Sequence, residues 1–154
     1  MTLAPVDLVA AVPDPELPMV TIADLGILRD VAVDGGVVTV TITPTYSGCP
    51  AMDAIRTDIQ RALGRAGHHR VEVRTRLSPA WTTDWMSDTA KRKLADAGIA
   101  PPGRRQPVTV ALSARCPQCG SLDTEEISRY GSTSCKSLWR CRACAEPFDH
   151  FKAI

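Results

Sequence analysis

The amino-acid sequence predicts a two-domain protein of the α+β/α/β class: a small two-layer domain with a mixed sheet, then a smaller cysteine-rich β domain. Within residues 27–77, a strand pattern passes into a helix pattern and back into a strand pattern. Two CxxC pairs stand within the last forty residues. Prolines and glycines in the stretch "GIAPPGRRQP" interrupt any regular element between these parts. We therefore expect domains at 1–100 and 113–154, joined by a linker and leading strand at 101–112.

The size and composition are those of a globular protein. The chain has 154 residues, of which 44% are hydrophobic and 23% charged, so it can bury a core. No apolar run approaches the roughly 20 residues that a membrane helix needs, and the first residues lack the pattern of a signal peptide. We expect a cytoplasmic protein without a membrane partner. In that reducing compartment, six cysteines point to metal ligands or reactive thiols rather than disulfides.

The charge distribution argues against a nucleic-acid-binding protein. Residues 1–100 hold 10 Lys and Arg against 12 Asp and Glu, and residues 101–154 hold 8 against 5. The two parts therefore carry formal charges of -2 and +3, which sum to the +1 of the whole chain. The sequence "GRRQP" with Arg115, Arg140 and Arg142 favours a nucleic-acid-binding ribbon, but three excess charges give little phosphate attraction.

The first regular element is a predicted hairpin. In "ILRDVAVDGGVVTVTITPT", apolar residues alternate on both sides of Asp34-Gly35-Gly36, whose glycines permit a positive φ. Val38, Val40 and Ile42 would share one face of the second strand.

A crossover helix and a third strand are expected next. Met52, Ile55, Ile59 and Leu63 recur at helical spacing, and "VEVRTRL" then alternates again. Strand, helix and strand in this order predict a right-handed parallel crossover and thus a mixed sheet. A further helix is expected in "MSDTAKRKLADAG", with Leu94 and Ala97 on its apolar side.

A single cysteine, Cys49, is expected between the second strand and the crossover helix. It precedes Pro50, which suits the first helical turn. Unpaired N–H groups and the helix dipole favour a negative charge there, and thiols so placed can have a pKa of roughly 3.5–7.5. The alternative is that Cys49 is a small buried hydrophobic residue, as most free cysteines are.

No general base is expected beside Cys49. His68 and His69 follow the far end of the helix, where they are more typical of a helix terminus. Asp14 and Glu16, in "DPE", have the character of turn residues. A hydrolase or another enzyme with its own substrate is therefore not indicated.

The four cysteines of the C-terminal part predict a zinc ribbon. Cys116, Cys119, Cys141 and Cys144 form two CxxC pairs separated by 21 residues. The segments between the pairs can form a hairpin around Gly131. The 39 residues from Cys116 to Ile154 are near the lower limit of about 40 for an unaided domain. A structural Zn²⁺ supplies about 10–16 kcal/mol of apparent binding free energy. Sulfur ligation by itself also allows iron or an iron–sulfur cluster.

Two residues of the ribbon have open or structural interpretations. Cys135 shares strand parity with Cys141, so it is either a substitute ligand or a buried packing residue. His150 is expected in a strand, flanked by core Phe148 and Phe151.

Three stretches of the chain resemble a known family. "DPELPMVTIADLGILRDV", "VTVTITPTYSGCPAM" and "WTTDWMSDTAKRKLADAGI" are similar to the small α/β domain of SufT-like and cytosolic iron–sulfur targeting proteins. The added ribbon, ending in "RYGSTSCKSLWRCRACAEPFDHFK", narrows the resemblance to the PaaD (also PaaJ) family, encoded with the bacterial phenylacetyl-CoA epoxidase of aerobic phenylacetate degradation.

The resemblance implies a non-catalytic accessory factor. Members assist iron–sulfur cluster assembly or delivery, so the implied partners are the reductase and oxygenase components of the epoxidase or iron–sulfur carrier proteins. The family's reactive cysteine matches Cys49, and its acidic turn matches Asp14 and Glu16. One thiolate cannot hold a cluster by itself, so a client or a second copy in a homodimer would supply further ligands. The alternative is a stable structural subunit of the epoxidase without a transfer role.

Overall fold

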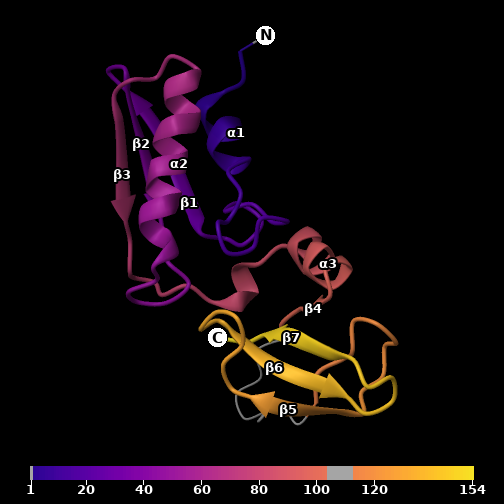
Figure 1. The fold of residues 1–154 in the computed structure, drawn as a ribbon. Coiled ribbons are helices and arrows are strands. Elements are labelled where there is room, and N and C mark those ends of the chain that lie inside the picture. The colour runs from indigo at the N-terminus through magenta and orange to yellow at the C-terminus, as the bar shows by residue number, and fades with distance from the viewer. Residues whose placement is uncertain (1, 104–112) are drawn as a thin grey trace. The chain divides into compact units, whose positions relative to one another are not determined.

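The computed structural model describes residues 2–103 and 113–154, which form two compact units, Met1–Ser87 and Asp88–Ile154. Each unit has its own sheet (Figure 1). The expected boundary near residue 100 lies later in the chain than this division. Most of the expected linker and leading strand at 101–112 falls outside the described residues.

The first unit contains a three-stranded mixed sheet of order β1-β2-β3. Strands β1 and β2 are antiparallel, and β2 and β3 are parallel, so the predicted hairpin and crossover are confirmed. Gly35 and Gly36 make the hairpin turn with φ of 55° and 78°, a conformation that glycine adopts without strain. The elements are α1 (Pro5–Ala10), β1 (Leu28–Asp34), β2 (Val37–Ile42), α2 (Ala51–Arg65), β3 (Val71–Thr75) and the 3₁₀ turn η1 (Thr83–Trp85).

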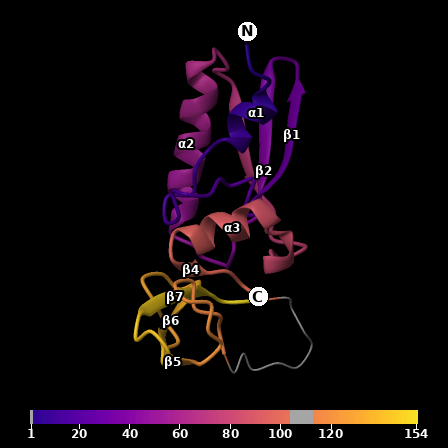
Figure 2. The ribbon, with the colours of Figure 1, turned by 90° about the vertical axis from the view of Figure 1, so that its right-hand side faces the viewer.

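Helices α2 and α1 cover one face of this sheet (Figures 1 and 2). The buried side of β2 faces the helices with Val38, Val40 and Ile42. Ile55, Ile59 and Leu63 form the buried side of α2, as their spacing predicts. Burial of both apolar stripes against each other stabilises the two layers.

The segment between β3 and α3 returns to the loop that precedes β1. Trp81 donates its Nε1–H to the carbonyl oxygen of Leu25 at 2.8 Å, and the Ser87 N–H donates to the Asp24 carbonyl oxygen at 2.9 Å. The Trp85 ring lies 3.8 Å below the guanidinium of Arg29. These contacts fix the turn around Gly26, which has a φ of 78°.

The second unit contains a four-stranded sheet of order β4-β7-β6-β5. Strand β5 pairs antiparallel with β6, which pairs antiparallel with β7, and β4 lies parallel to β7. The pairing of β4 with β7 explains why the division precedes α3. The elements are α3 (Asp88–Asp96), β4 (Ile99–Ala100), β5 (Thr124–Ser128), β6 (Lys136–Cys141) and β7 (Pro147–Phe151).

The predicted apolar side of α3 is confirmed at Leu94 and wrong at Ala97. Leu94 is fully buried, with Ala90 as its buried neighbour one turn earlier. Ala97 is exposed, because the helix ends at Asp96 and the chain turns at Gly98 with a φ of 81°.

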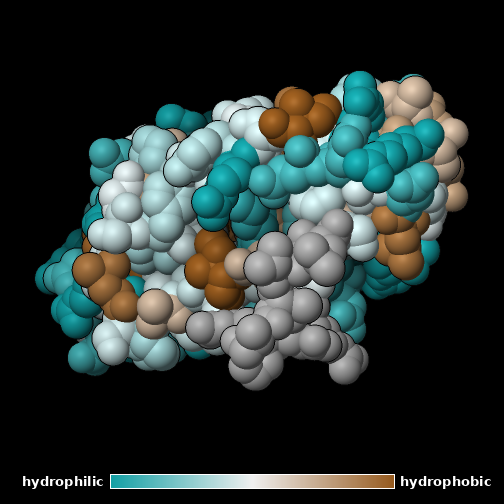
Figure 3. Space-filling model, turned by 90° about the horizontal axis from the view of Figure 1, so that it is seen from below, coloured by the Kyte–Doolittle hydropathy of each residue, from teal (hydrophilic) through white to brown (hydrophobic). Residues whose placement is uncertain are grey.

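The core of the ribbon surrounds Trp139. Its Nε1–H donates to Ser137 Oγ at 2.8 Å, and the His150 ring packs edge-on against it with centroids 5.8 Å apart. The predicted position of His150 in a strand with buried Phe148 and Phe151 is confirmed. Hydrophobic residues on the molecular face seen in Figure 3 form separate small groups among polar ones.

Candidate functional site

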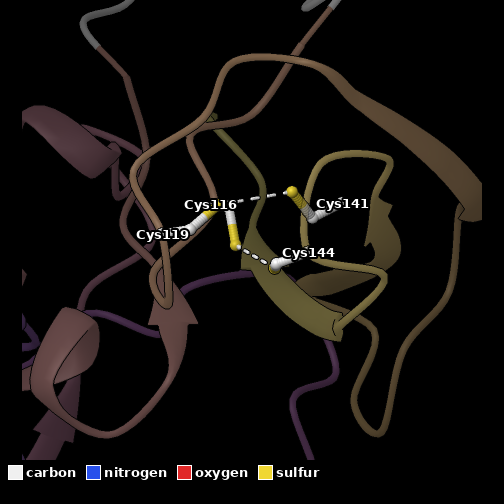
Figure 4. A group of neighbouring side chains, drawn as sticks. All are labelled: Cys116, Cys119, Cys141 and Cys144. Carbon is white, nitrogen blue, oxygen red and sulfur yellow. Dashed lines mark hydrogen bonds between the residues drawn. The ribbon is translucent and has the colours of Figure 1, made fainter.

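The four predicted ligand cysteines converge on one point. Cys116 and Cys119 lie on the turn that precedes β5, where the Gly120 N–H donates to the Cys116 carbonyl oxygen at 2.9 Å. Cys141 is the last residue of β6, and Cys144 lies on the turn that follows. Figure 4 shows the four side chains directed toward one another from these two turns.

The sulfur–sulfur distances fit a single tetrahedral ion. All four Sγ atoms lie within 4.8 Å of one another. The Sγ atoms of Cys116 and Cys144 are 3.7 Å apart, and those of Cys119 and Cys141 are 3.6 Å apart. A tetrahedron with Zn–S bonds of about 2.3 Å has edges of roughly 3.8 Å. The donor set therefore fits zinc, whereas a cluster would need space for several irons and bridging sulfides between the cysteines.

Neighbouring sulfurs affect the ionisation of Cys141 and Cys144 in opposite directions. The N–H of Cys144 leads the effects that lower the pKa of Cys141 to about 7. The N–H of Glu146 lowers the pKa of Cys144, but desolvation and the neighbouring sulfurs outweigh it and raise this pKa to about 12. A bound divalent cation removes that repulsion and stabilises all four thiolates. The centre is thus suited to hold a metal permanently.

Cys135 lies outside this cluster. It precedes β6, whereas Cys141 ends it, and six strand residues span roughly 20 Å. Its side chain is 5% exposed, and its Sγ lies 2.9 Å from Thr133 Oγ1. These observations agree with the packing interpretation of Cys135.

Cys49 occupies the predicted junction between β2 and α2 and is half-buried. Its N–H donates to the Tyr46 carbonyl oxygen, and its own carbonyl oxygen accepts from the Met52 N–H, both at 3.3 Å. Burial is the largest influence on the thiol and raises its pKa. The N–H of Ala51 at the helix start lowers this pKa, but not enough to compensate. The helix start therefore does not by itself bring the pKa of this thiol below its ordinary value.

The acidic turn at residues 14–16 carries two carboxylates, Asp14 and Glu16, which have different contacts. Asp14 is buried, and its Oδ1 accepts from the N–H groups of Glu16 and Leu17, each at 2.8 Å. Asp14 is thus the turn residue that its sequence context indicates. The charge of Glu16 raises the pKa of the Cys49 thiol, which places this carboxylate within electrostatic reach of the sulfur.

Three residues in the segment between β2 and α2 have contacts or burial that the sequence did not indicate. The hydroxyls of Tyr46 and Thr45 donate to the sulfur and lower its pKa. Thr43 is 1% exposed, and its Oγ1 has no hydrogen-bond partner within the described part of the chain. Buried hydroxyls are nearly always paired, so Thr43 is unusual. In the sequence, Thr43 falls on the alternating face opposite Val38, Val40 and Ile42, and this position gives no signal of an unpaired hydroxyl.

The comparisons with known proteins match each unit to a family. The model of the PaaD zinc beta ribbon domain matches residues 100–152, and that of the iron-sulfur cluster assembly protein family matches residues 7–74. The structure of the domain of unknown function DUF59 from Bacillus anthracis is 33% identical with a TM-score of 0.54. That match covers 58% of this chain and 87% of the other. Fold and site thus define an iron–sulfur-assembly-type domain joined to a zinc ribbon.

One relative matches both parts of the chain and identifies the family. A protein of Escherichia coli (strain K12), named as a putative subunit of 1,2-phenylacetyl-CoA epoxidase, is 46% identical over 148 residues, which cover 96% of this chain and 90% of the relative. The chain belongs to the PaaD family. The "Fe-S protein maturation auxiliary factor SufT" of Staphylococcus aureus (strain USA300) is 40% identical over 80 residues, which cover 51% of this chain and 90% of that protein.

Among the described residues, no helix combines the length and the apolar character that a membrane span requires.

Proposed function

We propose that this chain is a non-catalytic maturation factor of a phenylacetyl-CoA epoxidase system, acting in the cytoplasm. Its first domain would assist iron–sulfur cluster assembly or delivery to the reductase or oxygenase component. The observation that carries the proposal is Cys49, a half-buried free thiol at a strand–helix junction with the carboxylate of Glu16 in reach. It lies in the domain that matches the iron–sulfur assembly family.

The chemistry of Cys49 supports a transient contact with iron. When iron binds as cargo, the thiol loses its proton to water and the sulfur takes the iron in its place. The nearby Glu16 carboxylate adds a second negative group that attracts the cation. One thiolate leaves the coordination of iron incomplete, so we propose that a client, a carrier protein or a second protomer supplies the remaining ligands.

The zinc ribbon has a separate, structural part in this proposal. Its four sulfurs fit one closed tetrahedral site, which leaves no open position for transfer. Arg140 and Arg142 do not form a free basic surface, because both pair with Glu125, at 3.0 Å for Arg142. These pairs weigh against the nucleic-acid interpretation.

The decisive experiment measures a client rather than this protein. The reductase and oxygenase components would be purified without oxygen from cells carrying wild-type protein, Cys49→Ala or Cys135→Ala. We expect Cys49→Ala to lower the iron and acid-labile sulfide of one component several-fold. Cys135→Ala is the matched control and should change neither. Full iron and sulfide content with Cys49→Ala would refute the transfer role.

A stable structural subunit is the second candidate, because the Escherichia coli relative is named as part of the epoxidase. A structural subunit should co-purify with the oxygenase in a fixed stoichiometry, whether or not Cys49 is present. A maturation factor should be absent from the mature complex. Size-exclusion chromatography of the purified complex therefore separates the two candidates.

A further inference from the structure

A groove lies between α1, with the turn that follows it, and the C-terminal half of α2. Its volume is about 360 Å³, at the lower end of the range for ligand sites, so it suits a short segment rather than a folded domain. Leu8, Ala11 and Pro13 line one side, and Asp58, Arg61 and Arg65 line the other. The groove lies entirely within the first unit.

The charged side of the groove is cationic. Arg61 donates to Asp58 Oδ1 at 3.0 Å, and this exposed pair is close to neutral as a unit. Arg65 makes no ion pair or side-chain hydrogen bond with any described residue. A positive guanidinium thus borders an apolar surface.

The positive charge of Arg65 contrasts with the net charge of the first unit, which is negative. Residues 1–87 hold 7 Arg and Lys against 10 Asp and Glu, a formal charge of -3. In the last two turns of α2, residues 58–65, however, the sequence holds two arginines, Arg61 and Arg65, against one acid, Asp58. The end of the helix is therefore a cationic region of an acidic domain, and it attracts anionic groups locally.

The groove is distinct from the thiol site. Cys49 precedes the first turn of α2, whereas Arg61 and Arg65 lie in its last two turns. At 1.5 Å per residue, this separation is roughly 20 Å. A segment bound in the groove would leave Cys49 accessible.

We propose that this groove docks a short acidic and apolar segment of a partner protein. A carboxylate of the segment pairs with Arg65, and Arg–carboxylate pairs can form two parallel hydrogen bonds. Leucine-like side chains of the segment cover Leu8, Ala11 and Pro13. The proposal does not depend on the chemistry of Cys49, so the client-iron experiment and the test below can fail independently.

The test uses the full-length, zinc-loaded protein and capped synthetic heptapeptides. One peptide carries three Glu and two Leu residues, a second replaces each Glu by Lys, and a third replaces each Leu by Ser. Binding is followed by amide chemical shifts of the ¹⁵N-labelled protein. We expect the Glu/Leu peptide to shift amides of residues 5–13 and 58–65, and to bind at least fivefold more tightly than the other two.

Three variants sharpen the test. Arg65→Glu and Ala11→Glu each place a carboxylate in the groove. Each variant should bind the Glu/Leu peptide at least fivefold more weakly than the wild type does. Both positions are exposed, so the fold should persist. Arg76→Glu is the matched control, because it makes the same charge change at an exposed arginine outside the groove. Absent binding, equal binding of the Lys/Leu peptide, shifts elsewhere, or an equal loss with Arg76→Glu would overturn the proposal.

Discussion

Gly26 holds a position that we expect no other residue to occupy without cost. It has a φ of 78°, and a Cβ added there would lie 2.7 Å from both Cβ and the carbonyl oxygen of Trp85. Carbon atoms in contact prefer separations of about 3.5–4.0 Å. Gly26→Ala must therefore displace the segment that Trp81 and Ser87 anchor through their hydrogen bonds to Leu25 and Asp24.

The loss of stability expected for Gly26→Ala is the sum of two separable costs. The left-handed backbone conformation costs alanine roughly 1–2 kcal/mol. Relief of the contact with Trp85 adds about 1–3 kcal/mol, as for other overpacking changes. Gly35→Ala is a matched control, because Gly35 also has a positive φ, of 55°, but an added Cβ would have no heavy atom within 4 Å. We expect Gly26→Ala to lower the free energy of unfolding by about 1–3 kcal/mol more than the control does.

Native-state hydrogen exchange of the α2 amides is the suitable assay, because these amides report on the first unit alone. The free energy of opening at Ile55 and Ile59 would be compared for wild type, Gly26→Ala and Gly35→Ala. Equal losses in the two variants would refute the reasoning. They would show that the segment around Trp85 moves aside at no measurable cost.

Three further predictions concern the sulfur sites and their surroundings. Cys141→Ser should reduce bound zinc from about one per chain to well below half, while Cys135→Ser leaves it unchanged; metal analysis of the purified variants decides this. Because the negative charge of Glu16 raises the pKa of the Cys49 thiol, Glu16→Gln should shift the pH–rate profile of Cys49 alkylation to lower pH, and an unmoved profile would contradict the assigned cause. Thr43→Val replaces an unpaired buried hydroxyl by a methyl group and should stabilise the first unit by about 1–3 kcal/mol in hydrogen exchange; destabilisation would mean that the hydroxyl has a partner.

Local patterns were sufficient to predict the elements that carry strong periodicity. The hairpin at Gly35 and Gly36 and the helix with Ile55 and Ile59 formed as predicted, because alternation and helical spacing each bury one face. Helix α1 was missed, since six residues give too short a pattern. The two-residue strand β4 was also missed, because its partner β7 lies almost fifty residues later and gives β4 no local signal.

The ligand cysteines were predictable, but the direction of the pKa shift of Cys49 was not. The spacing of a CxxC pair constrains the geometry of its own turn, so four ligands follow from sequence. The pKa of Cys49 depends instead on how far burial and Glu16 oppose the N–H of Ala51. A position at a helix start indicates only the last of these effects. Burial and long-range neighbours are set by packing, which the spacing around Cys49 does not encode.

The two sulfur sites differ in the number of sulfurs that they offer to a cation, which agrees with the separate parts proposed for them. At the ribbon, four thiolates surround one point and favour permanent retention of a cation. At Cys49 there is one sulfur, and burial raises its pKa, so a proton would compete with the iron of the proposed transfer. Under the proposed function, this competition would weaken iron binding and ease release to a client, because the returning proton restores the neutral thiol. A thiolate poised at neutral pH would bind iron more tightly and release it less readily. In the transfer role proposed for this domain, the raised pKa of Cys49 therefore favours release of iron over its retention.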